Sequence, residues 1–458
     1  MASEHYSDAS KPDALPIVLR LPQELVELVL DYLLDDRAAL CASSLIGGLW
    51  LPVSSRRLFS RFSWPPCAYH WRRPAVLYLR TCRCQHMLGS ADLTRLVTLL
   101  RSSPRISSHV RDLRVTTTWF RPGAGFLLGT TSPSEIAEIL EIAPCVESLE
   151  LHDLRLVPNM PISRPAVRSL RSLQIKAPTY NTDVMDFLQL LSSFTHISSL
   201  TLLDLLPNMD SEATLSGSLS RPAHDVEIDR IELSFRSINT GARWLNAFHE
   251  HLNLASVTSL DVHDPLTTLD GNDTFTTVLH RFVSQCAQLR SLTFHNFISG
   301  AFSSYPSPCP TLKEMRFITP VFHDIAGVRG APWHLVREAV DCPFASAVQD
   351  VVLELSLHSK LLYHEPNQAS LEQSLRQILE AMDWAVFAAI SNRLRSLTMM
   401  VKLGRRPRVW GSQGHPIPEV VDTHAYRRVI DDFVRARLSL SCDQEVRVAI
   451  LDSSLGYP

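Results

Sequence analysis

The chain has 458 residues, of which 45% are hydrophobic and 20% charged, and its formal net charge is 44 − 47 = −3. This composition is typical of a folded protein, and the length is too great for one compact core. The small net charge gives no general attraction to nucleic acid or anionic lipid, and no apolar run is long enough to span a membrane. Nine cysteines are too sparse for a disulfide scaffold and the N-terminus has no apolar signal core, so we expect a cytoplasmic or nuclear protein, or both.

The first part of the chain predicts a disordered tail over residues 1–18 and a helical module over residues 19–64. Pro22 suits the first turn of a helix, where its missing N–H costs nothing. Apolar residues then follow at the spacing of one helical face: Leu25, Leu28, Val29, Tyr32 and Leu33. The Asp35-Asp36 pair is placed to cap a second short helix, and Pro52 can open a third. Three short helices bury little surface, so such a module leans on a partner or on the next domain.

Several motifs of this module follow one another in a recognisable order. They are Leu21-Pro22, Glu24-Leu25, the Ala-Leu-Cys-Ala-Ser-Ser-Leu segment that ends at Leu45, and Trp50. In this order they resemble an F-box, and the module is similar to the F-box-like domains of filamentous fungi and mushrooms. It departs from the family at Gly47-Gly48-Leu49, where Cys-Arg-Ser is frequent.

The resemblance implies that the chain binds a Skp-family adaptor and, through it, a cullin scaffold. Carried over by position, the residues that would face or support the adaptor are Leu21, Pro22, Leu25, Leu45, Trp50 and Leu51. The same residues could instead form the core of a small helical bundle, because an F-box uses its apolar residues for both purposes. The sequence leaves both roles open.

From residue 110 onward a pattern of three apolar residues recurs. Two variable positions separate the first apolar residue from the second, and one variable position separates the second from the third. Its ten copies are Val110-Leu113-Val115, Val146-Leu149-Leu151, Leu170-Leu173-Ile175, Ile197-Leu200-Leu202, Ile228-Ile231-Leu233, Val257-Leu260-Val262, Leu289-Leu292-Phe294, Leu312-Met315-Phe317, Val348-Val351-Leu353 and Leu394-Leu397-Met399. The last two residues of each copy alternate as a strand requires, and most gaps between copies hold a helical pattern. Strand and helix in alternation predict an α/β solenoid whose parallel strands line a concave face.

These repeats resemble leucine-rich repeats, which often follow an F-box. We therefore expect a helical linker or cap over residues 65–109 and an irregular solenoid over residues 110–458. The repeats lack the asparagine or cysteine that normally follows the strand, so the regular asparagine ladder cannot form. The turns must then satisfy their backbone groups in another way.

Alternation along each strand sends the residue between the last two apolar positions to the concave face. The residues predicted there to bind a target protein are Arg114, Glu150, Gln174, Glu232, Asp261 and Arg316. A solvated sheet face would have the same polarity. The mixture of both charge signs with histidines and apolar residues in the neighbouring positions favours a protein interface.

No motif in the sequence supports catalysis, a cofactor or a metal site. Cys82, Cys84 and His86 offer three ligands where zinc needs four, and no second cluster stands nearby. We therefore expect a non-enzymatic substrate-recognition adaptor of a Skp–cullin–F-box ubiquitin ligase, with an unknown protein target and neither nucleic acid nor membrane as a partner. The alternative is a repeat-protein interaction scaffold outside ubiquitination, whose N-terminal helices only cap the solenoid.

Overall fold

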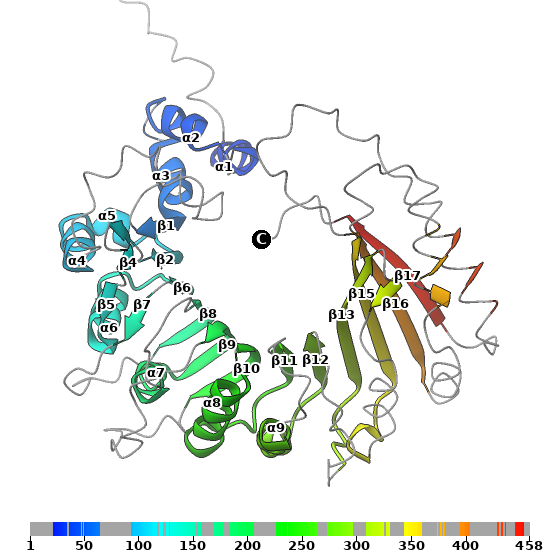
Figure 1. Ribbon diagram of the computed structural model, residues 1–458. Helices are drawn as coiled ribbons and strands as arrows, with labels where there is room; N and C mark the ends of the chain where they lie inside the picture. Colours follow the sequence, from blue (N-terminus) through cyan, green and yellow to red (C-terminus); the bar gives the residue numbers. More distant parts are fainter. Residues whose placement is uncertain are drawn as a thin grey trace, which may run out of the picture. The chain divides into compact units, whose positions relative to one another are not determined.

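The computed structural model has an α/β fold built on parallel strands (Figure 1). It describes most of residues 22–64, 93–156, 168–176, 184–205, 226–263, 273–295, 308–329 and 343–359, the strands 394–403 and 445–452, and isolated residues between 373 and 436. The chain divides into two compact units, one of Met1–Thr116 with Glu138–Leu149 and one of Thr117–Ala137 with Glu150–Pro458. In the described part of the chain, no helix is long and apolar enough to cross a bilayer.

The first unit contains the N-terminal helices and the first strands. Its elements are α1 (Gln23–Tyr32), α2 (Arg37–Ser43), α3 (Trp50–Ser60), β1 (Arg61–Trp64), α4 (Leu93–Ser102), α5 (Pro104–Ser107) and β2 (Asp112–Thr116). The division between the units falls within α6 (Pro133–Ile142) and β6 (Ser148–His152). Sequence patterns placed residues 61–64 in the helical module, whereas the structure forms them into strand β1, which pairs in parallel with β2.

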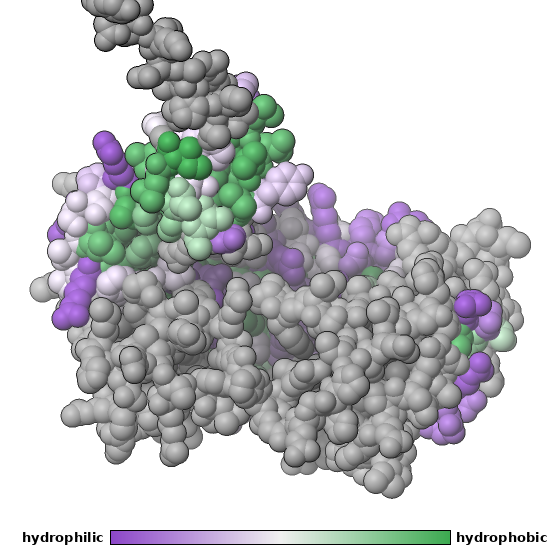
Figure 2. Space-filling view, turned by 90° about the horizontal axis from the view of Figure 1, so that it is seen from above, coloured by the Kyte–Doolittle hydropathy of each residue, from purple (hydrophilic) through white to green (hydrophobic). Residues whose placement is uncertain are grey.

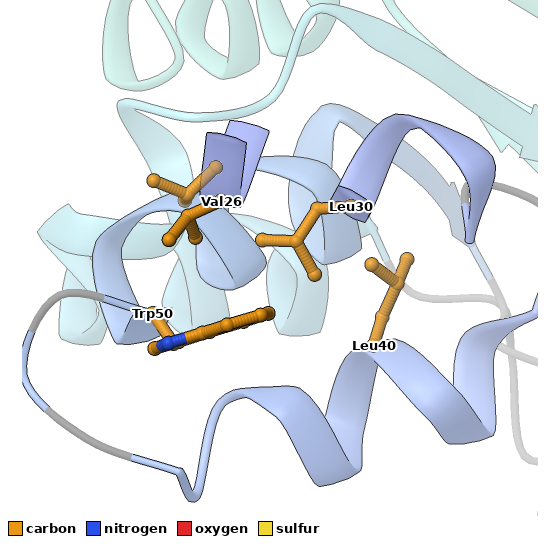
Figure 3. Packing of buried hydrophobic residues seen from close by; sticks show 5 residues of the cluster. Val26, Leu30, Leu40 and Trp50 are labelled. Carbon is orange, nitrogen blue, oxygen red and sulfur yellow. The ribbon is translucent and has the colours of Figure 1, made fainter. Parts of the chain in front are cut away.

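The three N-terminal helices share a small apolar core. Its buried residues are Val26, Leu30, Leu40, Trp50 and Val53 (Figure 3). Leu33 and Leu58 are partly buried and pack against them. The predicted cap of the second helix is present, because the Asp36 carboxylate accepts a hydrogen bond of 3.0 Å from the Ala39 amide. An ion pair between Asp31 and Arg57 also joins α1 to α3.

The second unit contains a parallel sheet with helices on one face. Its sheet strands are β8 (Ser169–Lys176), β9 (His196–Leu205), β10 (Glu227–Phe235), β11 (Ser259–His263), β12 (Ser291–His295), β13 (Glu314–Asp324), β15 (Asp350–Ser359), β16 (Ser396–Leu403) and β17 (Glu445–Asp452). Each strand pairs in parallel with the next in this order. The only described antiparallel strand beside them is β14 (Gly327–Arg329), on β13.

Smaller elements complete the described part of the second unit. They are an antiparallel pair of β3 (Trp119–Arg121) with β4 (Gly125–Leu127), a parallel pair of β5 (Gly129–Thr131) with β7 (Leu154–Leu156), and a short 3-10 helix (Pro343–Ala345). Helices α7 (Val184–Leu191), α8 (Ile238–His251) and α9 (Asp273–Gln285) lie on the same side of strands β8–β12 (Figure 1).

The recurring apolar pattern corresponds to the strands, as predicted. The last two residues of each of its ten copies fall on a strand, and the middle residue is buried in all of them: Leu113, Leu149, Leu173, Leu200, Ile231, Leu260, Leu292, Met315, Val351 and Leu397. In the second unit these residues face an apolar layer from the helices. Rings of Phe187, Trp244 and Phe248 contact one another there, with centroids 5.4–5.8 Å apart.

Backbone hydrogen bonds join neighbouring repeats just before their strands begin. The carbonyl of Arg290, just before β12, accepts bonds of 2.9 and 3.0 Å from the amides of Lys313 and Glu314 in the next repeat. The carbonyls that accept two amides in the same way within the second unit are Thr258, Arg290, Lys313 and Gln349. Main-chain atoms thus join each repeat to the next at the N-terminal ends of their strands, and this contact does not depend on the side chains there.

Candidate functional site

The helices α1–α3 present an exposed apolar surface, which we call the docking face. It consists of Leu25, Leu28, Val29, Tyr32, Leu45, Ile46 and Leu51, whose exposed fractions range from 41% to 86%. Among the described residues, every large apolar side chain that is exposed belongs to this face. Figure 2 shows the apolar side chains of the module gathered on its surface. Such a concentration is typical of a protein interaction site.

Helix α1 carries this face because its sequence has two apolar stripes. At 100° per residue, Val26, Leu30 and Leu33 form one stripe, and these residues contribute to the core. Leu25, Leu28, Val29 and Tyr32 form a second stripe on another side of the helix, and this stripe is exposed. The helix therefore has more apolar surface than its own module can bury.

The predicted adaptor-binding residues divide between the docking face and the core. Leu25, Leu45 and Leu51 lie on the face, and Pro22 is exposed just before α1. Trp50 is 5% exposed and packs in the core, so it supports the face without lining it. Leu21 lies outside the described residues.

Four residues of the docking face were not among the predicted binding residues: Leu28, Val29, Tyr32 and Ile46. The signal that could have found three of them is the second stripe of α1. One stripe has the full helical spacing of i, i+3, i+4 and i+7, in Leu25, Leu28, Val29 and Tyr32. The other stripe has the i, i+4 and i+7 positions of the same spacing, in Val26, Leu30 and Leu33. With two such stripes on one short helix, the module buries only one of them.

The second candidate surface is the face of the β8–β17 sheet that lies opposite α7, α8 and α9, here called the polar sheet face. Strand pairing places one residue from each of six neighbouring strands in a single row: Gln174, Thr201, Glu232, Asp261, Thr293 and Arg316. Four of these are predicted target-binding residues. The other two predicted residues, Arg114 and Glu150, lie on β2 and β6.

Ion pairs link the charged residues of this face across neighbouring strands. Arg230 on β10 pairs with Asp261, and Arg316 on β13 pairs with Glu354 on β15. Glu354 is fully buried and Asp261 nearly so, although alternation directs both away from the helix layer. A buried carboxylate needs such a partner, so both pairs have a structural role as well as any role in binding.

Glu232 is more accessible, and hydrogen-bonding groups lie on both sides of it. Thr201 Oγ1 donates to Glu232 Oε2 at 3.3 Å, and His263 Nε2 lies 3.2 Å from Glu232 Oε1. The hydrogen bond with His263 lowers the pKa of Glu232, even though burial opposes it. The carboxylate is therefore a stable anion near the middle of the polar sheet face.

Neither surface contains a recognisable catalytic or metal centre in its described residues. No group of three or more His, Cys, Asp or Glu side chains in that part of the chain could hold a metal ion. Cys82, Cys84 and His86 lie outside the described residues. What the described geometry offers is two surfaces of different character, one apolar and one polar. No protein-family model matches the chain, and a search of curated proteins found no match.

Proposed function

We propose that this chain is a substrate-recognition adaptor of a Skp–cullin–F-box ubiquitin ligase. In this proposal the docking face of α1–α3 binds a Skp-family adaptor, and the polar sheet face binds a target protein. The chain contributes binding and no chemistry of its own.

The observation that carries the proposal is the concentration of exposed apolar side chains on α1–α3. A terminal cap of a solenoid needs a polar outer surface to stay soluble. Here Tyr32 is 86% exposed and Leu45 is 85% exposed, which is unfavourable for a surface that stays in water. This distribution favours a docking module over the alternative of a simple cap on a repeat scaffold.

The polar sheet face supports the second half of the proposal less directly. In its described residues it mixes Glu232 and Arg230 with hydroxyl groups, and it has no exposed large apolar side chain. A mixed polar surface of this kind suits a specific and reversible protein contact. Target binding at Glu232 and its row stays a prediction.

The test of the adaptor contact uses substitutions that change the face and leave the core intact. Leu25→Asp and Leu45→Asp should each weaken co-purification of the full chain with a Skp-family adaptor by more than about 100-fold, because a carboxylate would be buried unpaired. Thr98→Asp, on the exposed side of α4, is the matched control and should bind normally.

The free protein should tolerate these changes. Leu25 and Leu45 are exposed, so their replacement should change the free energy of unfolding by roughly 0.5 kcal/mol or less. If the wild-type chain does not bind the adaptor at about micromolar concentration, or if both aspartate variants bind as the wild type does, the proposal fails.

A further inference from the structure

The docking face has an acidic border along one side of α1. At 100° per residue, Glu24, Glu27 and Asp31 lie on the third side of the helix, between the core stripe and the exposed stripe that starts at Leu28. The helix sequence, QELVELVLDY, contains no basic residue. The border and the exposed apolar stripe are therefore adjacent over the whole length of α1.

The acidic border is only partly neutralised within the module. Asp31 pairs with Arg57 of α3. Glu27 accepts a hydrogen bond from the neutral amide of Gln23 at 3.0 Å. Within the described residues, neither Glu24 nor Glu27 forms an ion pair. Glu27 also stands four residues before Asp31, an arrangement of like charges that costs a few tenths of a kcal/mol in a helix.

The basic residues of the module stand on other elements. Arg37 begins α2, Arg56 and Arg57 lie on α3, and Arg61 begins β1, where it lies 3.8 Å from Asp112. Among the described residues, only Asp31 of the acidic border pairs with one of these arginines, Arg57. Charges at the border of an apolar contact set the approach and orientation of a partner more than they set its affinity.

We propose that the protein that occupies the docking face has an apolar groove bordered by basic side chains, which pair with Glu24 and Glu27 and orient α1 as the two proteins approach. This inference rests on the proposed function, since it specifies the chemistry of the Skp-family adaptor at the same face. The apolar stripe supplies the affinity, and the acidic border accelerates association.

The test measures association and dissociation rates of the full chain with a purified Skp-family adaptor at about 25 mM and about 300 mM salt. For the wild type, the association rate should fall about tenfold between the two conditions. The double variant Glu24→Gln with Glu27→Gln should associate about fivefold more slowly at low salt and lose most of the salt dependence. Its dissociation rate should change less than about twofold.

A matched control removes the same charge elsewhere at the same spacing. Glu138→Gln with Glu141→Gln changes two carboxylates three residues apart on α6 and should leave both rates unchanged. The reversal Glu24→Lys with Glu27→Lys should associate more slowly still, and faster as salt is added. If the glutamine variant associates at the wild-type rate at low salt, the acidic border has no part in docking and the inference is overturned while the proposed function stands. If the wild type does not bind the adaptor at all, both are overturned.

Discussion

The imidazole rings of His263 and His295 stack on neighbouring strands of the second unit, with their centroids 3.6 Å apart and their planes 12° from parallel. They are aligned by the pairing of β11 with β12, which places the two histidines opposite each other. Glu232 contacts His263, and Asp261 and Glu354 act on His295 electrostatically. The pKa of His295 nevertheless falls to about 4, first because of burial and then because of the neighbouring His263.

This relationship predicts that acid destabilises the second unit before its carboxylates titrate. The pKa of His295 is about 4 in the folded chain, against 6.5 as its ordinary value. As pH falls through this window, the unfolded chain binds a proton that the folded chain does not. Stability is therefore complete above pH 6.5 and is lost progressively toward pH 4, by about 2 kcal/mol between about pH 7 and pH 5.

Urea unfolding at several pH values measures this effect. The variant His295→Gln should lose most of the pH dependence in this window while it keeps a cooperative transition. If the wild type and His295→Gln lose the same stability between about pH 7 and pH 5, the buried neutral state of His295 is not its cause.

A second prediction concerns the buried carboxylates of the polar sheet face. Arg316→Gln removes the cation that pairs with the fully buried Glu354 and should cost about 2–3 kcal/mol in the free energy of unfolding. Arg395→Gln is the matched control, because Arg395 is 71% exposed beside Asp350, and it should cost less than about 1 kcal/mol. Equal losses in the two variants, measured by chemical denaturation, would mean that burial of Glu354 does not govern the effect.

A third prediction tests the packing of α8 on α9. A methyl group on Gly241 would lie 2.5 Å from the ring of the buried Phe275 and 3.1 Å from that of Phe235. Gly241→Ala should therefore destabilise the protein by about 1–2 kcal/mol, despite the better helix propensity of alanine. Gly48→Ala, with nothing within 4 Å of the new methyl, should change stability little. A stabilising Gly241→Ala in thermal unfolding would show that the two helices pack less closely than described.

The fourth prediction separates the two surfaces by function. Glu232→Lys reverses an accessible charge on the polar sheet face and lies far from α1–α3 in sequence. A target can be identified as a protein that accumulates when this chain is deleted from the cell. The same target should accumulate when the Glu232→Lys variant replaces the wild type. Co-purification of the variant with the Skp-family adaptor should be unchanged. Normal target levels with this variant would place recognition elsewhere. Asp261 is a poorer choice for this test, because it is buried in an ion pair.

The sequence predicted the strands well because each strand repeats one local pattern. A buried leucine-like residue at the middle of each triplet is a strong requirement of the parallel sheet, so it survives irregular spacing between repeats. The sequence could not show a buried position that lies three residues before the triplet in seven described repeats, since residues as different as Phe194, Leu254, Cys286 and Ala345 occupy it. In five of these repeats a turn defines the position, because the amide of the first triplet residue donates to its carbonyl, as Leu289 does to Cys286 at 3.0 Å.

The candidate surfaces were less predictable than the strands. Alternation along the strand predicted that Asp261 points away from the helix layer. It could not predict the ion pair of Asp261 with Arg230, because the sequence does not show how the neighbouring strands are aligned. For α1, periodicity identified an apolar helix and could not say which of two stripes the module itself would bury. Trp50 illustrates the same difficulty, because a tryptophan suits a core and an interface equally until its neighbours are known.

Hydrogen–deuterium exchange of the full chain, with and without a Skp-family adaptor, measures whether the docking face of α1–α3 binds that adaptor. Binding at this face should slow exchange in peptides that cover residues 25–51, where the exposed apolar residues lie, and should leave exchange in strands β8–β13 unchanged. Unchanged exchange in residues 25–51 at saturating adaptor, or protection confined to the sheet strands, would contradict it.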